Sequence, residues 1–342
     1  MKIYKDIDLR PYNTFGIHAV AKCLIEIENG GELEQVLPEY PSALILGGGS
    51  NVLLLNGHIE CVIHIAHRGI EVIDKDNRHV WVRVQAGEPW NDFVQWALEH
   101  DFGGVENLAL IPGSTGAAPV QNIGAYGREV KEVIERVEAI ERQTGKPEIF
   151  TPEQCGFGYR DSIFKSSLKG HYVIRSVVFR LNLPPHRIST SYGSISQWLQ
   201  RRGIEKPGIK DVANAVMDIR RSKLPDPGVA GNAGSFFKNP IVSREQFEQL
   251  HRKYPEIPHY PATEKGSVKL AAGWLIDQCG LKGYRMGNAA VHDRQALVLV
   301  NTGNASGKDI AGLAQFIVET VYQHFGIRLE REVNYVGSAE KS

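Results

Sequence analysis

The sequence predicts an α+β protein of two or three domains. Apolar runs typical of strands are interspersed with apolar stripes at helical spacing, and the chain has no repeats or low-complexity linkers. At 342 residues, with 42% hydrophobic and 23% charged residues, it is long and apolar enough to bury a large core. The segment Pro225-Asp226-Pro227 stops a predicted helix and suggests a domain boundary.

The first half mixes both element types. Residues 43–55 (ALILGGGSNVLLL) predict a strand, a glycine turn and a second strand, and residues 80–86 predict another strand. Trp90, Phe93, Val94 and Ala97 share one face of a helix that ends near Gly103. Further on, the pattern predicts strands over 133–140 and 171–183 and a helix over 209–222.

The second half predicts its own α+β unit. Ser243 with Gln246 begins a helix, and a second helix runs from Ala271 to a stop at Gly280. Residues 296–300 predict a short buried strand, and Ser306 with Asp309 begins a longer helix that Gly326 closes. Residues 327–335 alternate apolar and polar, which predicts a last strand whose apolar side is interrupted by Arg331.

Charge and composition narrow the class of partner. The formal net charge is zero and the pI is near 7.2, so we expect no nucleic acid and no membrane as partner, and a small ligand instead. The N-terminus lacks an apolar signal region and no run approaches a membrane span, which predicts a cytoplasmic protein. His64 and His67 would lie on opposite faces of a strand. The four cysteines are isolated, so no metal site and no disulfide framework is expected; they are Cys23, Cys61, Cys155 and Cys279.

The stretch 107–127 (NLALIPGSTGAAPVQNIGAYG) carries no charged side chain and four glycines. Glycine lets backbone approach a ligand closely, and successive bare N–H groups bind anions such as a diphosphate. Gln121 and Asn122 add amides that can pair with a heterocycle or with backbone. A turn cluster packed for structural reasons has the same composition, so composition leaves both interpretations open.

A second glycine turn follows the strand that begins at Ala43. Gly47 to Asn51 is not a Rossmann fingerprint, because Val52 stands where the third glycine belongs and a strand follows. A P-loop fails as well, since Gly307-Lys308 is followed by Asp309. Two separate N–H nests favour a ligand with two phosphates or an extended dinucleotide.

Three side chains are candidates for chemistry. Ser235 lies in a polar loop and is by default a turn residue; it fits no nucleophile elbow, but could donate a proton if neighbours such as Lys238 or Lys223 stabilise its alkoxide. Arg160 could bind a carboxylate in bidentate fashion. The simpler alternative is that it forms a surface ion pair with Asp161. Glu332 would by default be solvated.

Several short motifs occur in order along nearly the whole chain. They are 11–16 (PYNTFG), 47–52 (GGGSNV), 111–113 (IPG), 121–127 (QNIGAYG), 158–162 (GYRDS), 223–227 (KLPDP), 231–240 (GNAGSFFKNP), 271–276 (AAGWLI) and 329–333 (LEREV). Together they resemble the UDP-N-acetylenolpyruvoylglucosamine reductase family, in its long form.

The resemblance implies a fold of the vanillyl-alcohol-oxidase (PCMH) type, with two FAD-binding lobes and an additional α+β substrate-binding domain. The expected lobes are residues 1–67 and 68–218, the latter completed by 326–342, with the substrate domain at 219–325. It also implies non-covalent FAD, NADPH as co-substrate and a monomer. The residues expected to bind FAD are Gly47, Gly48, Gly49, Ser50, Asn51, Ile111, Pro112, Gly113, Ser114, Gln121, Asn122, Gly124, Ala125 and Tyr126.

The implied reaction belongs to peptidoglycan precursor synthesis. NADPH reduces FAD and leaves, and the enolpyruvyl sugar nucleotide then receives hydride from flavin N5 at C3. Arg160 and Glu332, the latter protonated or bridged by a proton, are expected to stabilise the enediolate, while Ser235 donates a proton to C2. The residues expected to bind substrate are Tyr159, Tyr192, Arg220, Lys223, Asn239 and Gln295.

One departure and two alternatives accompany this resemblance. The family usually has proline where Arg331 stands, and alternation puts Glu330 and Glu332 on the same face, so it cannot separate them. The alternatives are a small-alcohol or sugar oxidase on the same flavin fold, and a sugar-nucleotide binding protein without redox chemistry. A purely structural role also explains Arg220, which lies at the end of a helix.

Overall fold

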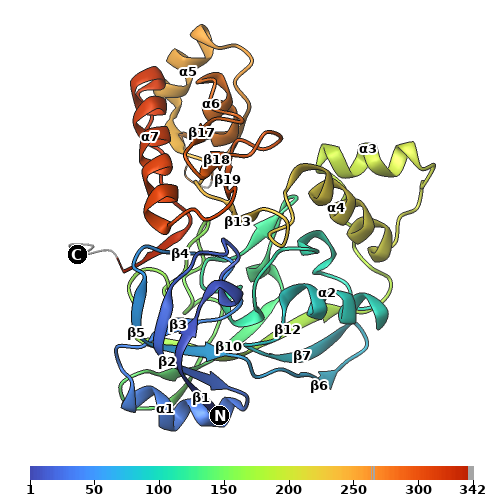
Figure 1. Cartoon of the computed structure of the whole chain (residues 1–342). Helices are drawn as coiled ribbons and strands as arrows, with labels where there is room; N and C mark the ends of the chain where they lie inside the picture. Colours follow the sequence, from blue (N-terminus) through green and yellow to red (C-terminus); the bar gives the residue numbers. More distant parts are fainter. Residues whose placement is uncertain (263, 265, 338–342) are drawn as a thin grey trace. The chain divides into compact units, whose positions relative to one another are not determined.

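The computed structural model describes residues 1–262, 264 and 266–337 (Figure 1). By their internal contacts these residues form two compact units. The first unit contains 1–7, 21–49 and 59–222, and the second contains 8–20, 50–58 and the chain from 223 onward. Each unit is therefore built from separate stretches of sequence.

The first unit is organised around a five-stranded antiparallel sheet. Its order is β11 (Pro147–Phe150), β10 (Ile134–Glu141), β12 (Tyr172–Asn182), β7 (His79–Gln85) and β6 (Ile70–Lys75). The apolar face of α2 (Trp90–Glu99) packs on this sheet, with the Phe93 ring stacked on Phe179 at 4.7 Å. The predicted strands at 80–86, 133–140 and 171–183 and the predicted helix at Trp90 are confirmed.

A four-stranded sheet lies mostly in the same unit. Its order is β1 (Lys2–Asp8), β2 (Val20–Ile27), β5 (His58–Ile65) and β3 (Leu44–Leu46), with β3 parallel to β5. Besides α2, the α-helices of this unit are α1 (Leu33–Glu39), α3 (Gly193–Arg201) and α4 (Ile209–Lys223). A short hairpin joins β8 (Gly124–Ala125) to β9 (Arg128–Glu129). The helix predicted over 209–222 is α4.

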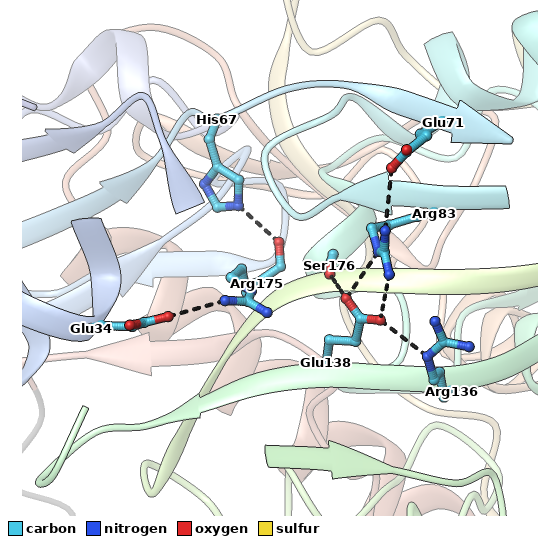
Figure 2. Close-up of polar contacts among 8 residues, drawn as sticks. All are labelled: Glu34, His67, Glu71, Arg83, Arg136, Glu138, Arg175 and Ser176. Carbon is cyan, nitrogen blue, oxygen red and sulfur yellow. Dashed lines mark hydrogen bonds and ion pairs between the residues drawn. The ribbon is translucent and has the colours of Figure 1, made fainter. Parts of the chain in front are cut away.

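A polar cluster crosses the five-stranded sheet (Figure 2). The Glu138 carboxylate, in β10, is 6% exposed and accepts hydrogen bonds from Ser176 Oγ at 2.6 Å and from Arg83 Nε at 3.2 Å. Arg136 Nε donates to the same carboxylate at 3.0 Å. Burial alone would raise the pKa of Glu138, but these hydrogen bonds and the two positive charges lower it overall. Glu138 is therefore a buried carboxylate held in its charged form.

The second unit contains a four-stranded and a three-stranded sheet. The first runs β13 (Gly231–Ser235), β19 (Val298–Asn301), β18 (Ala289–Val291) and β17 (Arg285–Met286). The second runs β14 (Ile241–Ser243), β16 (Ser267–Leu270) and β15 (His259–Pro261). The helices are α5 (Arg244–Lys253), α6 (Ala272–Gln278) and α7 (Gly307–Phe325), as predicted within one or two residues at most ends.

The helix signals in this unit have their expected geometry. Ser243 accepts from the N–H of Gln246 at 3.1 Å, and the reciprocal box of Ser306 and Asp309 begins α7. Gly326 ends α7 at φ +67°, a backbone conformation that favours glycine.

The predicted last strand at 327–335 is wrong over most of its length. Strand β20 covers only Asn334–Val336, parallel to β4 (Val52–Leu54), and Arg331 forms one isolated bridge to Phe237. Ile327, Leu329 and Val333 are buried, so the alternation is real. Alternation reports an extended backbone with one covered face, and it carries no information on whether a partner strand exists.

Three further properties concern the described part of the chain. No helix there is long and apolar enough to cross a bilayer. No three His, Cys, Asp or Glu side chains gather there as metal ligands would. The four cysteines are unbridged thiols, and Cys155 is buried.

Candidate functional site

Two glycine loops far apart in sequence lie against each other in the first unit. A Cβ added at Gly47 would come within 2.3 Å of Ser114 Oγ, and one at Gly48 within 3.1 Å of Gly113 Cα. Neither position has room for a side chain without a shift of its neighbour. The loop after β3 and the predicted stretch 107–127 are therefore in direct contact at these positions.

This backbone retains bare donors. Ser114 is held from both sides, since Gly113 O accepts from Trp90 N at 2.9 Å and Thr115 N donates to Glu88 O at 2.8 Å. Among the described residues, no protein acceptor pairs with the N–H groups of Gly47, Gly48, Gly113 and Ser114. Unpaired N–H groups from adjoining glycine loops are the chemistry that a diphosphate requires, so the residues present fit a dinucleotide cofactor.

Backbone strain gathers around the same stretch. Of the seven described non-glycine residues with positive φ, four lie here: Leu110 (+59°), Asn122 (+44°), Tyr126 (+50°) and Arg160 (+54°). Such conformations cost on the order of 1–3 kcal/mol each and persist where surrounding contacts enforce them. Here the Asn122 amide donates to Gly158 O at 2.9 Å and accepts from Lys131 N at 3.1 Å. The Asn122 side chain thus fixes the loop that carries Tyr159 and Arg160.

Four of the predicted substrate and catalytic residues meet at this strained region. The Tyr126 and Tyr192 rings pack edge to face, with their centroids 5.3 Å apart. Arg160 Nη2 donates to Gly124 O at 2.6 Å and Arg220 Nε to Leu110 O at 3.2 Å. The Tyr159 ring lies 5.6 Å from the Arg160 guanidinium carbon.

The electrostatics of this group favour an anion. Burial lowers the pKa of Arg220, the positive charge of Arg160 lowers it further, and Tyr126 opposes both. Burial raises the pKa of Tyr126, so its phenol stays protonated. Two guanidiniums that repel each other are stabilised by an anion placed between them.

The second unit brings Ser235 and Glu332 together. Ser235 ends β13, and its neighbour Phe236 accepts a hydrogen bond from the N–H of Glu332 at 2.9 Å. Asn51 Nδ2 donates to Glu332 O at 3.3 Å, and Asn51 O accepts from Asn334 N at 3.1 Å. Arg160 belongs to the first unit, whereas Ser235 and Glu332 belong to the second.

The segment beside Ser235 distinguishes the two glutamates. Lys238 Nζ lies 2.5 Å from Glu330 Oε1, and Lys238 N donates to Glu330 O at 2.9 Å. The Arg331 guanidinium stacks 3.9 Å above the Tyr335 ring. Lys238 thus gives the Glu330 carboxylate a structural partner. The Lys238 ammonium, a predicted neighbour of the Ser235 hydroxyl, is thus paired with the Glu330 carboxylate.

The other predicted substrate residues lie in the second unit. Asn239 Oδ1 accepts from Ala272 N at 3.0 Å, at the start of α6. Gln295 Oε1 accepts from Leu297 N at 3.4 Å, and a Cβ at Gly273 would lie 3.1 Å from this oxygen. Lys223 is the last residue of α4.

Two asparagines with a positioning role were missed from the sequence. Asn107 is 1% exposed, and its Nδ2 donates to Ser189 O at 3.2 Å and Tyr126 O at 3.4 Å. Asn232 Oδ1 accepts from Gly234 N at 2.9 Å, in the turn of φ +68° that precedes Ser235. The only sequence signal was an amide beside glycine or within an uncharged run, which is common in turns.

The chain is similar to known proteins over nearly its whole length. Residues 226–336 match the family model described as UDP-N-acetylenolpyruvoylglucosamine reductase, C-terminal domain, and residues 35–149 match that of an FAD binding domain. The UDP-N-acetylenolpyruvoylglucosamine reductase of Flavobacterium johnsoniae is 49% identical over 338 residues, 98% of this chain and 100% of that protein. The protein of the same name from Neisseria meningitidis serogroup A is 48% identical and covers 96% of both chains.

A solved structure is similar throughout. The crystal structure of UDP-N-acetylenolpyruvylglucosamine reductase from Thermus caldophilus has a TM-score of 0.65 at 26% identity and covers 98% of both chains. With the match to an FAD binding domain, this confirms the fold class expected from the sequence, an α+β flavin-binding fold.

Proposed function

Because the chain belongs to the UDP-N-acetylenolpyruvoylglucosamine reductase family, we propose that it reduces UDP-N-acetylglucosamine enolpyruvate to UDP-N-acetylmuramate with NADPH, in peptidoglycan precursor synthesis. The observation that carries the proposal is the juxtaposed glycine backbone of Gly47 to Gly48 and Gly113 to Ser114, with its unpaired N–H groups. It suits the diphosphate of non-covalent FAD. We also propose that the chain is a cytoplasmic monomer. Its three parts would be residues 1–67, residues 68–218 with 326–342, and the substrate domain at 219–325.

FAD supplies hydride transfer when bound. The other residues expected to bind FAD adjoin the two glycine loops in sequence. They are Gly49, Ser50, Asn51, Ile111 and Pro112, and further along the chain Gln121, Gly124, Ala125 and Tyr126. The chain's task here is to hold and orient the cofactor.

The substrate's reacting end requires a charge partner and a proton donor. Hydride addition at C3 of the enolpyruvyl group moves electrons through C2 into the carboxylate, which becomes an enediolate. Arg160, with its planar fork, and a protonated Glu332 would stabilise that charge, a contribution of roughly 10²- to 10³-fold in rate per preorganised donor. Ser235 Oγ would then deliver a proton to C2.

The remaining side chains would hold the sugar nucleotide. Arg220, whose pKa is lowered beside Arg160, gains from an anion such as the diphosphate. Tyr192 would close over the nucleotide from its contact with Tyr126. Lys223, Asn239 and Gln295 would contact sugar, diphosphate or uracil.

A spectroscopic experiment tests this function. Purified protein, reconstituted with FAD where needed, should show flavin absorbance that NADPH bleaches without oxygen, and UDP-N-acetylglucosamine enolpyruvate should restore it. Rapid reoxidation by oxygen alone would favour an oxidase. Protein that stays colourless after incubation with FAD would favour a binding protein without redox chemistry.

A further inference from the structure

The first unit contains a cavity whose lining residues have no part in the reaction proposed above. Its volume is about 510 Å³, and it is lined by Arg128, Arg187, Ile188, Ser189, Thr190 and Ser191. The lining residues carry two guanidiniums and three hydroxyls, and no carboxylate is among them. Guanidinium forks with hydroxyl donors are the usual partners of a phosphate monoester.

The two arginines differ in their ion pairing. Arg128 Nη1 pairs with Glu132 Oε2 at 2.8 Å, with both side chains about one third exposed. Arg187 is exposed and has no ion-pair partner among the described residues. The cavity therefore keeps a net positive charge, which Arg187 mainly supplies.

Both walls of the cavity continue into the tyrosine pair of the candidate site. Ser191 directly precedes Tyr192, and Arg128 follows Tyr126 by two residues. Asn107 fixes the two walls, because its amide donates to Ser189 O and to Tyr126 O. An extended nucleotide lying along Tyr126 and Tyr192 could place an outlying phosphate in this cavity.

We propose that Arg128 and Arg187 bind the 2′-phosphate of NADPH, so that this cavity makes the enzyme prefer NADPH to NADH. The inference rests on the proposed function, in which NADPH and the sugar nucleotide use one site in turn. Only NADPH carries a phosphate monoester, whereas the sugar nucleotide carries a diphosphate, for which Arg220 and Lys223 are already candidates. The cavity thus serves one of the two nucleotides.

The direct test measures binding of 2′,5′-ADP and of 5′-AMP by calorimetry on the flavin-loaded protein. These probes differ by the phosphate in question, and their binding needs no turnover. We expect 2′,5′-ADP to bind about tenfold or more tightly than 5′-AMP, and Arg187→Ala to remove that difference. Equal binding of the two probes to the unaltered protein overturns the proposal, even if the enzyme reduces its substrate as proposed.

Kinetics give a second, separable readout. Arg187→Ala should raise the KM for NADPH about tenfold or more. The KM for NADH, the maximal rate of flavin reduction and the KM for the sugar nucleotide should all stay unchanged. A parallel rise in the KM for the sugar nucleotide would assign the cavity to the diphosphate instead and contradict the proposal.

Arg78 provides a matched control. Arg78 and Arg187 both line a neighbouring cavity of about 670 Å³, but Arg78 does not line the one proposed here. Arg78→Ala should leave the preference for 2′,5′-ADP intact, and Arg187→Lys should restore part of it. Loss of the preference in Arg78→Ala would move the phosphate to the neighbouring cavity and overturn the assignment to Arg128.

Discussion

Lys238 Nζ lies 2.5 Å from Glu330 Oε1, and this ion pair sits two residues from Glu332. The backbone N–H of Lys238 also donates to Glu330 O, and that of Glu332 to Phe236 O, both at 2.9 Å. The segment that carries the two glutamates is therefore held in register beside the Ser235 loop. Glu330 thus has a lysine partner, and Glu332 is the glutamate that we propose acts in the reaction.

Glu332→Gln and Glu330→Gln should accordingly differ. We expect Glu332→Gln to slow reoxidation of reduced flavin by the enolpyruvyl substrate about 10²- to 10³-fold, because an amide cannot offer the enediolate the acidic proton of a protonated carboxyl. Glu330→Gln removes an exposed ion pair and should change that rate less than about threefold. Stopped-flow absorbance of the second half-reaction distinguishes the variants. Equal losses would show that both carboxylates act.

Ser235→Ala should separate the two half-reactions. NADPH should bleach the flavin at the normal rate, while reoxidation by substrate should fall about 10²- to 10⁴-fold, since the proton donor to C2 is missing. Ser243→Ala is the control, because it removes a helix cap in the same unit and should leave both rates unchanged. If both half-reactions of Ser235→Ala slowed equally, Ser235 would lose the acid role.

Arg160→Lys should also damage the second half-reaction. A lysine keeps the charge but cannot present a planar fork to a carboxylate, so we expect a loss of about 10²-fold or more. It would also lose the geometry by which Arg160 contacts Gly124 O. Anaerobic reoxidation at saturating substrate measures this. An unaltered rate would mean that the substrate carboxylate binds elsewhere.

Gly47→Ala should impair flavin retention. The added methyl would lie 2.3 Å from Ser114 Oγ, so either this buried hydroxyl must rotate away or the two loops must separate, at about 1–3 kcal/mol. The ratio of flavin to protein absorbance and the Tm should both drop. Gly57→Ala is the matched control, since nothing lies within 4 Å of the added atom. Full flavin content in Gly47→Ala would argue against this backbone as the cofactor cradle.

Glu138→Gln should destabilise the first unit by about 1–3 kcal/mol, because Arg83 and Arg136 lose their shared carboxylate (Figure 2). The pKa of Glu138 is lowered in the folded protein, so its stabilisation is complete above the unfolded value of roughly 4.3. This stabilisation disappears as the pH falls through the pKa that Glu138 has in the folded protein. Urea unfolding at pH 7 and at acid pH should show the difference shrinking.

The control for this prediction is Glu135→Gln. Glu135 forms a surface pair with Arg180 at 3.8 Å, with 38% and 52% of the side chains exposed, so its loss should change stability by less than about 0.5 kcal/mol. A pH-independent difference for Glu138→Gln would show that packing, and not charge, makes the cluster stable.

Periodicity and capping predicted the helices well, because they are local properties. The Ser306 and Asp309 box and the Gly326 stop each depend on residues within one turn of the helix end. The strand predicted at 327–335 was wrong because pairing depends on a partner far away in sequence. Asn334–Val336 pairs with β4, and Arg331 forms a single bridge to Phe237.

In the candidate site, too, local features could be predicted from the sequence and long-range contacts could not. Glycine content marked both loops as nests, but the contact of Gly47 with Ser114 joins residues 67 positions apart, which no local pattern contains. Likewise, alternation could not separate Glu330 from Glu332. The ion pair of Lys238 with Glu330 is a tertiary contact, which no local pattern contains.

The second unit draws on three stretches of chain, which limits how the protein can be dissected. A fragment expressed from residue 223 onward would leave β20 without β4, and the N–H of Asn232 without the Thr14 carbonyl that accepts it at 2.9 Å. Truncation at that point should thus yield insoluble or unfolded material.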